Sequence, residues 1–124
     1  MRYAILCYDL EAVTTSWTKE EDEAVISRLQ VVQRKLAAEG KLGPVARLMP
    51  TTAATTLRKG GETVIIDGPF AETKEQLLGF YIVDCESLEE ALDAARQLAE
   101  ASSHGSGSYE VRPVMLFYGG DDMP

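Results

Sequence analysis

Hydrophobic positions follow a strand pattern at the start of the chain and a helical pattern soon after it. Residues 2–8 are apolar on both alternating sets of positions, which is typical of a strand covered on both faces. After a polar loop, Thr18 and Glu21 form a capping box, and apolar residues then recur at helical spacing up to Gly40. The pattern therefore predicts a helix over residues 18–39.

The middle of the chain has the pattern of β structure. Lys59-Gly60-Gly61 separates two short apolar runs and is typical of a hairpin turn, while Pro44 interrupts the run before them. A longer apolar run follows the hairpin. The strands predicted in this region are residues 42–49, 54–58, 62–66 and 78–84.

A second helix follows these strands. Ser87 and Glu90 repeat the capping-box spacing, and apolar residues that include Leu92 and Leu98 recur at helical spacing until about Ala101. The expectation is that this stripe, with Leu92 in it, packs into the core.

Residues 109–118 form the last predicted strand, with Pro113 favouring an edge position or a bulge, and residues 119–124 are expected to fray. The order is strand, helix, strand, hairpin, strand, helix, strand. This is the split βαβ order of the ferredoxin-like α+β fold with an inserted β-hairpin. A chain of 124 residues has the usual size of one domain, so we expect residues 1–124 to form a single one.

The two faces of such a sheet are not covered equally. Right-handed crossovers place both helices on one face. The first, fifth and last predicted strands are nevertheless apolar on both alternating sets of positions. Leaving several of these side chains in water would cost several kcal/mol at about 25 cal/mol per Å². We therefore expect a homodimer in which a second copy covers the open face.

Charge and composition narrow the partners and the compartment. Twenty acidic and twelve basic residues give a formal net charge of -8, which repels phosphate backbones and anionic lipid. Nucleic acid and membranes are therefore not expected partners. No apolar run reaches the roughly 20 residues that span a bilayer, and no signal-peptide pattern is present, which favours the cytoplasm. Cys7 and Cys85 lie within apolar runs, which favours buried reduced thiols over a disulfide or a metal site.

The candidate chemistry gathers around the turn after the hairpin. Asp67 ends a strand just before Gly68-Pro69, so it either bonds backbone amides of its own turn or acts as a general acid or base. Arg58, Lys74 and Arg112 are cations on or beside strands of an acidic chain. If these elements converge, they would bind a small anionic or carbonyl-bearing ligand. No phosphate-binding loop, nucleophile elbow or metal-ligand spacing indicates a cofactor or a metal.

Residues 67–84, which open with Asp67-Gly68-Pro69-Phe70, resemble the signature of the YCII-related superfamily, in the branch named after the Asp-Gly-Pro-Phe motif. The resemblance extends to residues 55–58, 87–91 and 110–114. It implies a dimeric α+β barrel of ferredoxin-like subunits. The superfamily is distantly similar to muconolactone isomerase-like proteins and includes a dehydrochlorinase-like member. Genes of this branch often neighbour those of extracytoplasmic-function sigma factors, and neither association assigns a reaction to this chain.

The chain departs from the superfamily in its histidine. A His-Asp pair with the histidine near the first helix is the catalytic idea for that superfamily. The only histidine here is His104, in a Ser/Gly loop after the second helix, where it is a solvated polar residue or a candidate proton carrier. The candidate catalytic residues are thus Asp67 and His104, and Tyr81 joins the three cations as a candidate substrate-binding residue.

Two functions remain open at this point. One is a lyase or isomerase-type enzyme that uses Asp67 as base, with Arg or Lys stabilising an enolate-like anion. The other is a non-catalytic ligand-binding or regulatory domain associated with a sigma-factor system. In the second case, the same cleft or the acidic surface would recognise a ligand or a protein.

Overall fold

A computed structural model describes residues 1–102, 106–121 and 123–124. Four strands form an antiparallel sheet in the order β2-β5-β1-β6, and β3 pairs with β4 in a separate hairpin. The strands are β1 (Arg2–Asp9), β2 (Leu42–Arg47), β3 (Thr55–Arg58), β4 (Val64–Asp67), β5 (Gln76–Asp84) and β6 (Ser108–Pro113). The helices are α1 (Glu11–Thr15), α2 (Lys19–Ala38), the 3₁₀ turn η1 (Thr51–Ala53) and α3 (Leu88–Ser102).

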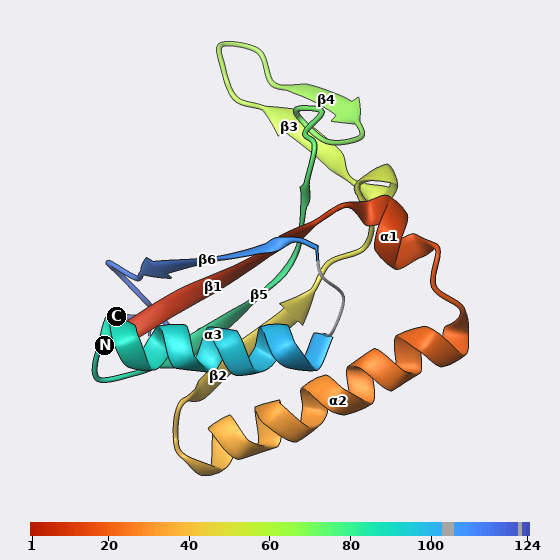
Figure 1. Ribbon diagram of the computed structural model, residues 1–124. Helices are drawn as coiled ribbons and strands as arrows, with labels where there is room; N and C mark the ends of the chain where they lie inside the picture. Colours follow the sequence, from red (N-terminus) through yellow and green to blue (C-terminus); the bar gives the residue numbers. More distant parts are fainter. Residues whose placement is uncertain (103–105, 122) are drawn as a thin grey trace.

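The α+β ferredoxin-like prediction is confirmed. The strand order puts the first and fifth strands at the centre, and α2 and α3 lie on the same side of the sheet (Figure 1). The predicted hairpin is present between β2 and β5, and it projects away from the sheet (Figure 1). In the part of the chain that the structure describes, no helix has the length and apolar character needed to cross a membrane.

Local side-chain hydrogen bonds explain where the long helices begin. The Thr18 hydroxyl accepts a bond from the Glu21 backbone N–H, and a Glu21 carboxylate oxygen accepts one from the Thr18 N–H, both at 3.1 Å. The Ser87 hydroxyl accepts from the Glu90 N–H at 3.1 Å in the same way ahead of α3. Each such cap contributes about 1 kcal/mol to the helix it opens. Gly40, with φ of 73°, follows α2 in the left-handed conformation that ends many helices.

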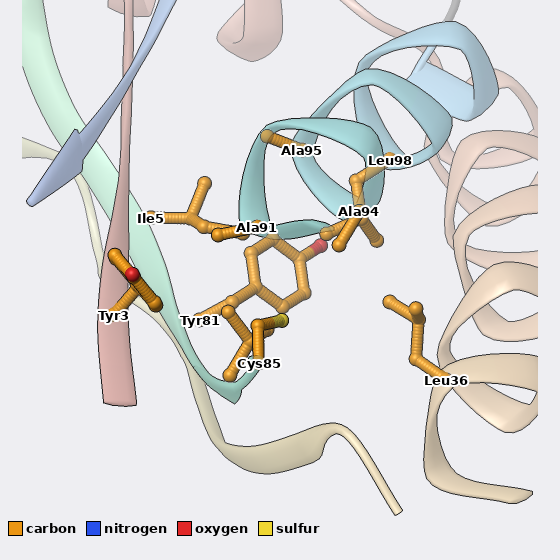
Figure 2. Packing of buried hydrophobic residues seen from close by; sticks show 10 residues of the cluster. Tyr3, Ile5, Leu36, Tyr81, Cys85, Ala91, Ala94, Ala95 and Leu98 are labelled. Carbon is orange, nitrogen blue, oxygen red and sulfur yellow. The ribbon is translucent and has the colours of Figure 1, made fainter. Parts of the chain in front are cut away.

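The core lies between α3, the C-terminal part of α2 and the inward side of the sheet. Figure 2 shows Ile5 and Tyr81 directed toward the α3 alanines, with Leu36 facing them from α2. Tyr3, Ile5 and Tyr81 share one face of the sheet because they occupy alternate or paired positions on β1 and β5. The buried hydrophobic residues are Tyr3, Ile5, Leu36, Tyr81, Val83, Cys85, Ala91, Ala94, Ala95 and Leu98.

The prediction that Leu92 packs into the core is wrong. Leu92 is 42% exposed, while Ala94 and Leu98 are 1% and 0% exposed. Small alanine side chains let α3 lie close to the sheet, so the buried stripe is narrow and excludes Leu92. Leu98 of the expected stripe is therefore buried, whereas Leu92 is not.

The end of the last strand and the loop before α2 also differ from the sequence prediction. The last strand ends at Pro113 rather than at residue 118, because its partner β1 begins at Arg2. Tyr3 pairs with Pro113, and the Val114 N–H donates to the Arg2 carbonyl at 2.9 Å. The loop before α2 contains the short helix α1, which was not predicted and has no side-chain cap. Of the tail predicted to fray, residue 122 lies outside the described residues.

Candidate functional site

A cavity of about 350 Å³ lies between α2 and the inward side of the sheet, toward the end of β1. The packing of α2 explains it. Leu36 near the C-terminal end of α2 is 1% exposed, whereas Leu29 is only half-buried and Ile26 is 37% exposed. The N-terminal half of α2 is therefore less tightly packed against the sheet than its C-terminal half, and the space between them is the cavity.

The lining of this cavity combines an apolar surface with a few polar groups. Among the described residues that line it, Asp9 and Arg47 carry the formal charges. Helix α2 contributes Val25, Ile26, Leu29, Gln30 and Gln33, and the strands contribute Cys7, Tyr8, Asp9, Val45, Ala46, Arg47, Leu78, Gly79, Phe80, Tyr81 and Tyr109; Thr14, Trp17, Ser102 and Ser106 complete the lining.

Asp9 is a buried carboxylate at the end of β1, with 3% of its surface exposed. Its Oδ1 accepts a bond from the Leu10 N–H at 2.7 Å, and the Ser106 hydroxyl donates to Oδ1 at 3.0 Å and to Oδ2 at 3.2 Å. Gly107 has φ of 88°, and a Cβ there would lie 3.0 Å from the Asp9 carboxyl carbon and 2.6 Å from the Tyr8 carbonyl oxygen. Glycine therefore lets the start of β6 pass close to the carboxylate.

Three weakly acidic side chains, Cys7, Tyr81 and Tyr109, lie on the sheet side of the cavity. Burial raises the pKa of the Cys7 thiol to about 12, and a hydrogen bond with Tyr109 opposes that shift. Burial also raises the pKa of Tyr109 and of Tyr81, and the bond from Gln33 opposes the shift of Tyr81. At neutral pH these groups are neutral, so Cys7 is not an activated nucleophile.

Arg47 and Trp17 separate this cavity from a second hollow of about 400 Å³, since both residues line both spaces. Arg47 donates to the two carboxylate oxygens of Asp22 on α2 at 2.8 and 3.3 Å. The second hollow is lined by Glu11, Lys19, Asp22 and Arg47 among others, so it is more highly charged than the first. The first cavity is therefore the better site for an organic ligand.

Of the residues proposed from the sequence, Tyr81 lines the cavity. Asp67 and Arg58 lie on the exposed hairpin, at opposite ends of the β3–β4 ladder, and Lys74 is exposed in the segment before β5. Arg112 alternates with the partly buried Val111 and donates to Glu110, so it faces the other side of the sheet.

The structure thus brings neither the three cations nor Asp67 to the cavity that Tyr81 lines, and their proposed roles stay predictions. His104 lies outside the described residues. No group of three or more His, Cys, Asp or Glu side chains within the described ranges could hold a metal ion.

Asp9 and Gln33 were not proposed from the sequence. Asp9 has the same parity along β1 as Tyr3, Ile5 and Cys7, so alternation alone puts its carboxylate on the inward face. That signal was present in the sequence. Gln33 shows no comparable signal, because its place beside Tyr81 depends on how α2 crosses the sheet.

A family model described as the YCII-related domain matches residues 1–118. The chain belongs to the YCII-related family. An uncharacterised protein of Rhizobium meliloti (strain 1021) is 63% identical to it over 122 residues, which is 98% of each chain. The matched region includes every residue that lines the cavity. The cavity is therefore part of the YCII-related domain itself.

Proposed function

We propose that this YCII-related protein binds a small, largely apolar organic molecule in the cavity between α2 and the sheet. The observation that carries the proposal is a cavity of about 350 Å³ with apolar walls and one buried carboxylate, Asp9. Small-molecule sites are concave, mostly apolar, and typically about 300–1,000 Å³, with a few polar groups that orient the ligand. The cavity has each of these properties.

If the bound molecule also reacts, proton transfer is the chemistry that the lining favours. Asp9 is a buried carboxyl group that lines the cavity and can exchange a proton as a general acid or base, and the neutral phenol of Tyr81 can donate a hydrogen bond to a developing oxyanion. The protonated Cys7 thiol does not favour covalent catalysis. A lyase or isomerase-type reaction would then use Asp9.

The earlier candidate base, Asp67, is exposed on the hairpin and does not line the cavity. Acid-base catalysis by Asp67 stays a prediction from the sequence, as does a regulatory role beside a sigma factor. Binding without reaction is the simpler function, because it requires only the cavity.

The chain's single tryptophan, Trp17, lines the cavity and serves as the reporter for a binding test. The uncharged dye N-phenyl-1-naphthylamine should quench Trp17 emission by energy transfer and bind one molecule per chain. Filling the cavity with Val25→Phe should weaken dye binding by roughly tenfold or more, which corresponds to about 1.4 kcal/mol or more.

Val31→Phe is the matched control, because Val31 lies on the same helix and is 64% exposed. It should leave the affinity for the dye unchanged. Absence of binding to the native chain, or equal binding by both variants, would overturn the proposed function.

A further inference from the structure

The polar groups of the cavity occur at two levels along its length. Tyr81 pairs with Ile5 on β1, and Asp9 lies four residues further along the same strand. At about 3.3 Å per residue these two levels are about 13 Å apart along the sheet. Apolar lining residues that include Leu29 and Leu78 complete the walls. An elongated molecule can therefore contact both polar ends at once.

The end at Tyr81 has hydrogen-bonding capacity left over. The Gln33 Nε2 group donates to the Tyr81 hydroxyl oxygen at 3.4 Å. Among the residues that the structure describes, neither side chain has another hydrogen bond, so the phenol proton and the amide oxygen of Gln33 have no protein partner there. Exchanging the amide oxygen and nitrogen of Gln33 would still leave this pair with a free donor. A carbonyl oxygen of a ligand is the group that such a donor binds.

The end at Asp9 requires a different group. Its carboxylate oxygens accept the bonds from the Leu10 N–H and the Ser106 hydroxyl, so this end favours a ligand hydroxyl or other donor over a further acceptor such as an anion. Arg47, the cation in the described lining, already binds both oxygens of Asp22. An anion would have to compete with that pair in a protein of net charge -8. The cavity therefore disfavours the anionic alternative.

We propose that the ligand of this cavity is an elongated, non-anionic molecule with a carbonyl group at the Tyr81–Gln33 end and a hydrogen-bond donor at the Asp9 end. The inference rests on the proposed function, since it requires that the cavity bind a small molecule. It goes further because it names the ligand class and the side chains that select it.

Four probes of one skeleton separate the two ends by displacement of the dye. The compound 4-(4-hydroxyphenyl)butan-2-one carries both groups, 4-butylphenol lacks the carbonyl and 4-phenylbutan-2-one lacks the hydroxyl. The fourth, 3-(4-hydroxyphenyl)propanoate, replaces the ketone with an anion. The two-group probe should bind roughly threefold to tenfold more tightly than either one-group probe, because it makes one more hydrogen bond with the protein. The anion should bind at least roughly tenfold more weakly than the two-group ketone.

Variants assign each preference to a side chain. Tyr81→Phe and Gln33→Leu should each reduce the advantage of the ketone over 4-butylphenol, and Asp9→Asn should reduce the advantage of the hydroxyl. Tyr118 is a half-exposed tyrosine outside the described cavity lining, so Tyr118→Phe is the control. It should change neither the advantage of the ketone nor that of the hydroxyl. Circular dichroism checks that each variant folds, and the Gln33→Leu result stands if Tyr81→Phe unfolds the protein.

The outcomes separate this inference from the proposed function. Dye binding with an anion preference, or a ketone advantage that survives in both Tyr81→Phe and Gln33→Leu, would overturn the ligand class and leave cavity binding intact. Failure of the dye to bind the native protein would overturn both.

Discussion

At the residue scale, three weak acids lie close together on the sheet side of the cavity. Cys7 pairs with Tyr109 across β1 and β6, and Tyr81 pairs with Ile5 across β5 and β1. Burial raises the pKa of Cys7, Tyr81 and Tyr109 alike. These three side chains are therefore uncharged at physiological pH.

The raised pKa of Cys7 predicts a loss of stability at alkaline pH. Below pH 9 the thiol is protonated in both states; between pH 9 and about 12 the unfolded chain loses the proton while the native state keeps it. The free energy of unfolding should therefore fall as pH rises through this window, by up to ~1.4 kcal/mol per pH unit for each such group.

Urea denaturation of the reduced protein at several pH values between 9 and 11 measures this slope. Cys7→Ala removes one titrating group, so its slope should be shallower than that of the native chain, whatever its stability at pH 7. A slope that is unchanged by Cys7→Ala would contradict the assignment.

At the scale of secondary-structure elements, the sequence predicted the features that depend on hydrogen bonds between neighbouring residues. Both long helices begin at Ser or Thr caps that the sequence revealed, because a capping box depends on neighbouring residues only. Helix α1 was missed because it lacks a cap and is held by distant partners; the Glu11 carboxylate accepts from the backbone N–H and the hydroxyl of Thr51 at 2.6 and 2.7 Å. The sequence predicted that Leu98 is buried but not that Leu92 is exposed, because the width of the buried stripe depends on how closely the alanines of α3 approach the sheet.

Leu98 is buried in α3 and Leu92 is exposed, so substituting each in turn tests how this helix packs. Leu98→Ala should lower the free energy of unfolding by about 2–5 kcal/mol, because Leu98 is fully buried and its loss leaves a cavity. Leu92→Ala, at a position 42% exposed, should cost less than about 1 kcal/mol. Urea denaturation followed by circular dichroism measures both, and equal losses would contradict the packing of α3 described above.

The candidate site was less predictable than the fold. The sequence favours Asp67 because it ends a strand at a turn, and Arg58, Lys74 and Arg112 because they are cations on or beside strands. Neither property brings side chains into one cavity. Asp9 could have been found from alternation along β1. The cavity itself could not, because it arises from the looser packing of one half of α2, which no local pattern determines.

At the scale of the whole molecule, α2 and α3 lie on one face of the sheet and leave the other face without a helix (Figure 1). Ala4, Leu6, Phe80 and Ile82 alternate with the buried residues of β1 and β5, so they point away from the helices. Covering such a face with an identical one would remove further apolar surface from water. We therefore expect a homodimer through this face.

Size-exclusion chromatography with light scattering should report about twice the mass of one chain. Ile82→Lys should shift the protein toward the monomer without unfolding it, because Ile82 lies outside the core of the single chain. A native protein that stays monomeric at high concentration would contradict the expected dimer.

The central claim, that the cavity between α2 and the sheet binds a small organic molecule, is tested most directly by mapping the bound probe. Two-dimensional ¹H–¹⁵N NMR with N-phenyl-1-naphthylamine should shift the amide signals of Cys7, Leu29 and Gly79, which line the cavity, and leave those of Ile65 and Asp67 on the hairpin unchanged. Shifts confined to the hairpin and to Arg112, or no shifts at saturating probe, would contradict the claim.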